Sequence, residues 1–233
     1  SLGFRGEALS SIASISDFSI TSRTSDDEHG WVLQIESDGK SHDIQPAAHP
    51  VGTTLEINNL FRTTPARRKF LRTERTEFLH ILDVVKGLAM SHFDISIELN
   101  HNGKSVLKCI KVKDDVQPRI KAVLGNQFYQ SARKIDYRKY DMYLWGWLGG
   151  ENTDRSQSDR QYFYLNRRII RDQRINHAIR MALENTLPQG RYPSYLLHLQ
   201  IDPATTDVNV HPTKKEVRFK DPRNVHDFIY TAL

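Results

Sequence analysis

The chain has 233 residues, and its 33 basic and 28 acidic side chains give a formal net charge of +5 and a pI of about 9.3. Its single cysteine, Cys109, excludes a disulfide framework and a Cys-x-x-Cys site, so we expect a reducing compartment. No apolar run approaches the roughly 20 residues that span a bilayer, which argues against a membrane helix.

The first half of the chain alternates between helical and extended patterns. Apolar residues at helical spacing predict a short helix at 6–13 and a longer one that follows an N-cap at Thr73. Period-two alternation predicts strands at 18–21, 31–35, 53–57, 95–99 and 106–110. The Asn102-Gly103 pair predicts the hairpin turn between the last two of these strands.

The second half begins a pattern of its own after the polar stretch 111–118, which therefore predicts a domain boundary. Helices are predicted at 120–124, at 175–183 and after the Asp221-Pro222 start signal, and strands at 143–147, 162–164 and 197–201. Hairpins dominate over strand–helix–strand alternation, so the pattern favours an α+β fold rather than a doubly wound parallel sheet. We predict two domains, 1–112 and 113–233.

Two short motifs are compatible with a nucleotide. Gly3, Phe4, Arg5 and Gly6 precede a helix start, where backbone N–H groups and the helix dipole favour an anion. Thr53 follows a glycine at the start of a strand and offers a hydroxyl. On pattern alone, a glycine turn and an ordinary strand explain these residues better.

Basic side chains gather in two segments. The first spans 62–75 and the second spans 166–174, and the basic residues that we take as candidate DNA contacts are Arg67, Arg68, Lys69, Arg168, Arg171 and Arg174. A solvated charged surface is an equally good interpretation of the first segment. Tyr162 and Tyr164 beside the second segment favour binding slightly.

Lys214 lies in a loop between two short apolar segments, from which a lysine can place a point charge on a phosphate. An ordinary surface lysine is the alternative interpretation. His211 lies nearby, but no second histidine or cysteine stands at metal-ligand spacing, so we expect no metal site built by this chain alone.

The order of four blocks carries more information than each block does. GFRGEAL, GTTLEI, FRTTPARRKFL and DVNVHPTKKEVRF occur in this order, and the chain thereby resembles the N-terminal region of the MutL family of DNA mismatch repair proteins, which are GHKL ATPases. The resemblance implies that 1–112 is the C-terminal portion of a Bergerat-fold ATPase sandwich. It also implies that 113–233 is a transducer domain with a ribosomal-protein-like α+β fold.

The resemblance assigns roles to the candidate residues. It implies that Gly3, Phe4, Arg5 and Gly6 close a lid on ATP and Mg²⁺, that Thr53 contacts the nucleotide, and that Lys214 contacts the γ-phosphate. The arginine loop departs from the family pattern, because this chain has Asn166-Arg167-Arg168 where the family commonly has Asn-Gly-Arg. DNA contact is therefore expected there only as a basic patch.

The family places a catalytic glutamate and a magnesium-binding asparagine before the lid, and neither is in this chain. We therefore expect ATPase activity in the complete module and none in this chain alone. The resemblance further implies binding to DNA with little sequence preference, to the mismatch-recognition protein MutS and to a downstream endonuclease or helicase. It also implies a homodimer through ATP-bound N-terminal halves, in the bacterial cytoplasm near the nucleoid and without membrane contact.

Two alternatives remain open from the residues. The first is a nucleic-acid-binding fragment without catalysis, because the basic segments are present and the catalytic base is not. The second is another GHKL ATPase such as a topoisomerase subunit, although the TPARRKFL block argues against it.

Overall fold

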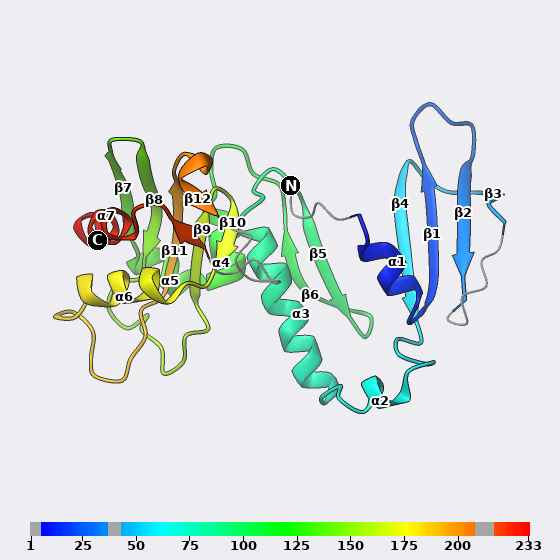
Figure 1. Ribbon diagram of the computed structural model, residues 1–233, viewed down its shortest axis with the longest axis horizontal. Helices are drawn as coiled ribbons and strands as arrows, with labels where there is room; N and C mark the ends of the chain where they lie inside the picture. The colour runs from blue at the N-terminus through cyan, green and yellow to red at the C-terminus, as the bar shows by residue number, and fades with distance from the viewer. Residues whose placement is uncertain (1–5, 37–42, 208–216) are drawn as a thin grey trace. The chain divides into compact units, whose positions relative to one another are not determined.

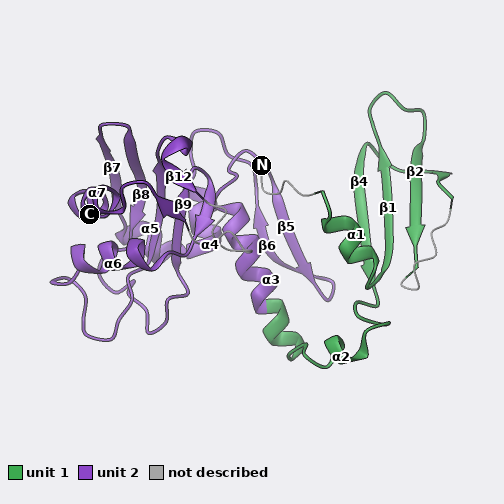
Figure 2. Cartoon of the chain, viewed as in Figure 1, with its two compact units in different colours: residues 1–78 green, residues 79–233 purple. Residues whose placement is uncertain are grey.

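The computed structural model describes residues 6–36, 43–207 and 217–233 (Figure 1). The chain forms two compact units, Ser1–Phe78 and Leu79–Leu233, and the division falls within helix α3 (Glu74–Ala89) (Figure 2). This division differs from the predicted domain boundary after residue 112, which stays a prediction. Among the described residues, no helix is both long and apolar enough to cross a membrane.

The first unit contains a four-stranded antiparallel sheet in the order β3-β2-β1-β4. Its strands are β1 (Asp17–Arg23), β2 (Gly30–Ile35), β3 (Gln45–Ala47) and β4 (Gly52–Asn58). Helix α1 (Ala8–Ala13) contacts β1, and helix α2 (Pro65–Arg68) follows β4 in the chain. The predicted helix and three strands are confirmed, whereas β3 is too short to carry a period-two signal.

The second unit contains a five-stranded sheet in the order β10-β9-β11-β8-β7, in which only the β9–β11 pair is parallel. Its strands are β7 (Arg133–Lys139), β8 (Met142–Leu148), β9 (Gln161–Leu165), β10 (Arg168–Ile170) and β11 (Tyr195–Gln200). Two further antiparallel pairs are β5 (Ile97–His101) with β6 (Lys104–Cys109), and β12 (Thr206–Asp207) with β13 (Arg218–Phe219). The mixed, mainly antiparallel sheet confirms the predicted α+β class.

Helices and two hydrophobic cores accompany this sheet. The remaining helices are α4 (Gln117–Leu124), α5 (Asn126–Ser131), α6 (Gln173–Ala182), the 3-10 helix η1 (Pro203–Thr205) and α7 (Pro222–Ala232). Leu197 and Leu199 of β11 belong to one core with α6 and α7, and Leu196 belongs to the other with α3, α4 and α5. Because side chains alternate along a strand, one strand serves both cores.

The local start and turn signals are confirmed. The Thr73 hydroxyl accepts from the backbone N–H of Thr76 at 3.3 Å, and the Asp221 carboxylate accepts from that of Asn224 at 3.0 Å. Asn102 and Gly103 both have positive φ, +50° and +76°, as the predicted two-residue hairpin turn requires.

A buried arginine caps the C-terminal end of α3. Arg119 of α4 is 1% exposed, and its guanidinium donates to the backbone carbonyls of Ala89, His92, Phe93, Ile95 and Ile110. The predicted strand at 95–99 is wrong at its first residues, because β5 begins only at Ile97. Ile95 instead lies in a turn whose carbonyl accepts a hydrogen bond from Arg119.

Candidate nucleotide site and nucleic-acid interface

Most residues that the sequence assigns to a nucleotide lie outside the described part of the chain. Gly3, Phe4, Arg5 and Lys214 are among them, so their roles stay predictions. Gly6 is described, and it has φ of +69° two residues before α1 begins. Its left-handed backbone at a helix start is the conformation that a glycine adopts without steric cost.

Thr53 lies on β4, where its side chain is exposed. Its Oγ1 atom is 2.8 Å from Oγ of Ser22, which is its partner in the register with β1. A hydroxyl held in this way keeps the capacity for a further hydrogen bond at the surface. Thr53 therefore fits a hydrogen-bonding contact to a phosphate or ribose.

The described residues do not form a binding site for a magnesium ion. Among these residues, no group of three His, Cys, Asp or Glu side chains is placed to hold a metal ion. Mg²⁺ is commonly bound through one or two carboxylates together with substrate phosphates rather than by a full protein cage. The described residues thus supply no site that would hold Mg²⁺ by themselves.

The first basic segment surrounds α2. Arg67, Arg68 and Lys69 are exposed, and none of them forms an ion pair with another described residue. Arg62, by contrast, pairs with Asp17, with 3.1 Å between the guanidinium nitrogen and the carboxylate oxygen. The three predicted contacts therefore present positive charge to solvent, as binding of a phosphate backbone requires.

The second basic segment starts at a tight turn between β9 and β10. Asn166 and Arg167 both have positive φ, +47° and +69°. The Asn166 side chain anchors the turn to β11's end, donating to the carbonyl of Ile201 at 2.9 Å and accepting from its N–H at 3.1 Å. This anchoring holds the turn in a strained conformation and sets where the Arg167 side chain projects.

The other arginines of this segment are placed by β10 and α6. Asp172 is the N-cap of α6, and its carboxylate accepts from the N–H groups of Arg174 and Ile175 at 2.9 and 3.3 Å. Arg174 is exposed in the first turn of α6, and Arg168 on β10 is half-buried. The structure thus places these two predicted contacts on neighbouring elements of one unit.

Arg171 already has a protein partner. Its guanidinium forms an ion pair with the carboxylate of Asp83 on α3 at 2.6 Å, and both side chains are about half exposed. A DNA phosphate would compete with Asp83 for this arginine, so we expect Arg171 to contribute less than Arg174. The sequence contains no local signal for this pair, because 88 positions separate the two residues.

An aromatic stack is the feature that sequence reasoning missed. His198 of β11 lies between Trp145 of β8 and Tyr164 of β9, and it is buried. The available signal was a histidine within the apolar run 195–199 near an alternating Trp145 and Trp147. This signal identifies His198 as a polar residue in a core strand, but it does not identify the side chains that stack on His198.

Known proteins resemble this chain in sequence. The family model for the C-terminal domain of DNA mismatch repair proteins matches residues 120–233. The MutL proteins of Pseudomonas paraeruginosa and Azotobacter vinelandii are each 48% identical to this chain over 235 and 237 residues, and each match covers 100% of the chain and 37% of the relative. The chain therefore spans little more than a third of the length of these relatives.

Solved structures agree with this match. A crystal structure of the N-terminal domain of a DNA repair protein has a TM-score of 0.82 at 25% identity, covering 99% of this chain and 74% of that one. The Aquifex aeolicus MutL ATPase domain complexed with ADP shares the fold, with a TM-score of 0.70 at 23% identity and coverages of 96% and 76%. The chain belongs to the MutL family of DNA mismatch repair proteins.

Proposed function

We propose that this chain is the part of a MutL-type mismatch repair protein that contributes the phosphate end of the ATP site and a DNA-binding surface. The 48% identity to MutL proteins over the whole chain carries this proposal and disfavours the topoisomerase alternative. The complete protein would hydrolyse ATP and couple this reaction to repair.

The nucleotide role rests on the four motif blocks. ATP with Mg²⁺ supplies the phosphoryl group and most of the local charge. Backbone N–H groups of residues 3–6 would hold the phosphates, the exposed hydroxyl of Thr53 would donate to the nucleotide, and Lys214 would neutralise the γ-phosphate. Phosphoryl transfer depends mainly on such positioning and charge neutralisation.

Steady-state ATPase assays on the complete protein test the role of Lys214. We expect Lys214→Ala to lower kcat by about tenfold or more, because one cation that stabilises the transition state is lost. Lys134→Ala, which removes an exposed lysine of β7, serves as the matched control and should leave kcat unchanged. Unchanged turnover in Lys214→Ala would exclude the proposed role. This chain alone should show no turnover, because it lacks the catalytic base.

DNA binding rests on Arg67, Arg68 and Lys69, which are exposed and form no ion pair with another described residue, and it requires no catalysis. Replacing Arg67, Arg68 and Lys69 together by alanine should weaken binding of duplex and single-stranded DNA to similar extents. It should also reduce the slope of log affinity against log salt by about 0.9 per lost contact on duplex DNA. Anisotropy titrations at several salt concentrations measure both quantities, and an unaltered slope would contradict the proposed interface.

Assembly is the remaining part of the proposal. We expect the complete protein to dimerise through its N-terminal halves when ATP is bound, and to act with MutS and a downstream endonuclease or helicase near the bacterial nucleoid. Size-exclusion chromatography with a non-hydrolysable ATP analogue tests the dimer. A monomer at saturating nucleotide would argue against it.

A further inference from the structure

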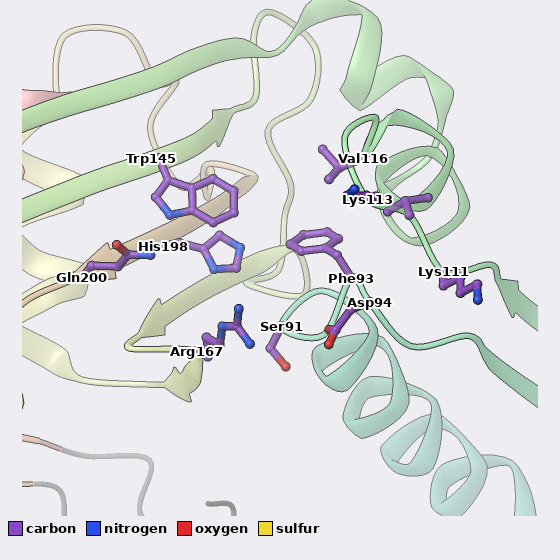
Figure 3. A pocket seen from close by; sticks show the side chains of 11 residues that line it. Ser91, Phe93, Asp94, Lys111, Lys113, Val116, Trp145, Arg167, His198 and Gln200 are labelled. Carbon is purple, nitrogen blue, oxygen red and sulfur yellow. The ribbon is translucent and has the colours of Figure 1, made fainter.

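A cavity of about 690 Å³ lies in the second unit, at the edge of the core that α3 and α4 share with the sheet. Figure 3 shows the aromatic rings of Trp145 and His198 close together, the ring of Phe93 facing them from the segment after α3, and the side chain of Arg167 near His198. Lys111 and Lys113 line it from the segment after β6. Its volume is within the range of about 300–1,000 Å³ that is usual for small-molecule sites.

The aromatic wall is built by strand register. His198 of β11 is the register partner of Trp145 on β8 and of Tyr164 on β9. The imidazole therefore stacks on both rings, with centroids 4.1 and 4.6 Å away and interplanar angles of 7° and 12°. Phe93 lies 5.9 Å from the imidazole centroid in a tilted arrangement. Both faces of His198 are covered, so only its ring edge can meet a ligand.

The ring edge of His198 has an unused hydrogen-bonding atom. The side chain lines the cavity and is 4% exposed, and its Nε2 atom has no hydrogen-bond partner among the described residues. Burial, reinforced by Arg167, lowers the pKa of His198 to about 3, so the ring is neutral at physiological pH. A buried polar atom without a partner is costly, and a polar atom of a ligand in the cavity would satisfy it.

Positive charge surrounds the cavity. Lys111, Lys113 and Arg167 are exposed, and among the described residues that line the cavity only Asp94 is acidic. Arg167 has φ of +69°, a conformation that costs an arginine free energy relative to glycine. The chain thus holds a cation at the cavity in a backbone conformation that disfavours its side chain, which is typical of a functional position.

We propose that this cavity binds a nucleotide unit, with the base against Phe93 and Trp145, a base polar atom at Nε2 of His198, and the phosphate toward Lys111, Lys113 and Arg167. Aromatic rings accept any planar base by stacking, and clustered cations accept a phosphate. The ligand is either a free mononucleotide or an unstacked residue of a DNA single strand. Only the second source rests on the proposed DNA binding.

Titrations with chemically matched probes test this inference. For the strand source, a single-stranded dT12 oligonucleotide is compared with a phosphodiester chain of equal length that has abasic sugars. For the free source, dTMP and dAMP are compared with inorganic phosphate by calorimetry. We expect base-containing probes to bind about fivefold or more tightly than their base-free counterparts, because each stacked base adds affinity.

Variants locate the effect in the cavity. Phe93→Leu should abolish the advantage of the base-containing probe, and Arg167→Gly should weaken its binding while leaving the thermal midpoint unchanged or higher. Lys134→Ala removes an exposed lysine of β7 outside the cavity and is the charge-matched control. A base advantage that survives Phe93→Leu, or binding that Arg167→Gly leaves unchanged, would overturn the proposal, even if DNA still bound through the residues around α2.

A measurement on the unaltered chain does not depend on the variants folding. Long-range proton–nitrogen NMR spectra report the imidazole nitrogens of His198, and Nε2 should shift when dTMP, dAMP or dT12 is added. Shifts with the mononucleotides and dT12 would show that both sources can supply the ligand, and shifts with dT12 alone would assign it to a strand. An unchanged Nε2 signal with every saturating probe, or an equal shift with inorganic phosphate, would exclude base binding.

Discussion

At the residue scale, His198 couples the stability of the second unit to pH. Its pKa falls from about 6.5 to about 3 on folding, mainly because the imidazole is buried. Between these values the unfolded chain binds the proton and the folded chain does not. Stability contributed by the neutral ring is therefore complete above about pH 6.5 and is lost as the pH falls toward 3.

Urea unfolding between pH 7 and pH 4 measures this loss. The free energy of unfolding should decrease by at most about 1.4 kcal/mol per pH unit from this one group. His198→Phe keeps a planar ring between Trp145 and Tyr164 but cannot take up a proton, so its slope should be shallower. Identical slopes for both proteins would show that His198 does not cause the pH dependence.

Gly146 is a second residue whose identity is set by its surroundings. A Cβ atom added there would lie 2.0 Å from the carbonyl oxygen of Leu196 on the neighbouring strand, and φ is +142°. We expect Gly146→Ala to lower the free energy of unfolding by about 3 kcal/mol or more. Gly103→Ala is the control, because Gly103 also has positive φ (+76°) but nothing within 4 Å of the added atom. Equal losses in urea unfolding would mean that the clash is relieved.

At the scale of elements, Arg119 joins α4 to the end of α3 and to the residues that flank the β5–β6 pair, Ile95 before β5 and Ile110 after β6. Its guanidinium donates to five backbone carbonyls, of which Ala89 belongs to the last turn of α3. A cation at a helix C-terminus also interacts favourably with the helix dipole. Because the carbonyls lie in a buried or half-buried setting, their loss of a donor cannot be fully replaced by water.

Replacing Arg119 by methionine keeps much of the side-chain volume and removes every donor. We expect Arg119→Met to lower the free energy of unfolding by about 3 kcal/mol, a typical cost for leaving buried partners unpaired. Arg223→Met, at an exposed position of α7, provides the comparison and should change stability by less than about 0.5 kcal/mol. A loss below about 1 kcal/mol in Arg119→Met would contradict the stabilising role of the Arg119 hydrogen bonds.

At the scale of the whole molecule, the two units differ in how much core they contain. The two hydrophobic clusters that the described residues form lie in Leu79–Leu233, whereas every residue of β4 in the first unit is exposed. β11 is paired on both sides and nearly all of its residues are buried. Local stability follows burial and backbone pairing, so the two units should open with different free energies.

Hydrogen exchange monitored by mass spectrometry tests this difference. Peptides that cover β4 (Gly52–Asn58) should exchange about 100-fold faster than peptides that cover β11 (Tyr195–Gln200), a ratio that corresponds to an opening difference of a few kcal/mol. Similar protection in the two strands would show that the first unit is as stable as the second.

Local sequence signals predicted much of the secondary structure. They failed where charged residues outnumber the apolar ones and obscure the period-two alternation of a strand. β8 was readable because apolar side chains fill both of its faces, with Trp145 and Trp147 alternating with buried residues. β7 pairs with it, yet its two inward residues, Ile135 and Tyr137, stand among five charged ones and give a weak signal. Burial by α7 and pairing with β8 therefore decide that this segment is a strand.

The sequence by itself determined the family, the α+β class, the positions of most strands and helices, and the two basic segments. These depend on local order along the chain: periodicity, capping residues and contiguous motif blocks. Only the tertiary structure decided that Arg171 pairs with Asp83, that Arg119 closes α3, and that His198 stacks between two rings at a basic cavity. These contacts join residues far apart in sequence, and strand register and helix packing, which no local pattern encodes, bring them together.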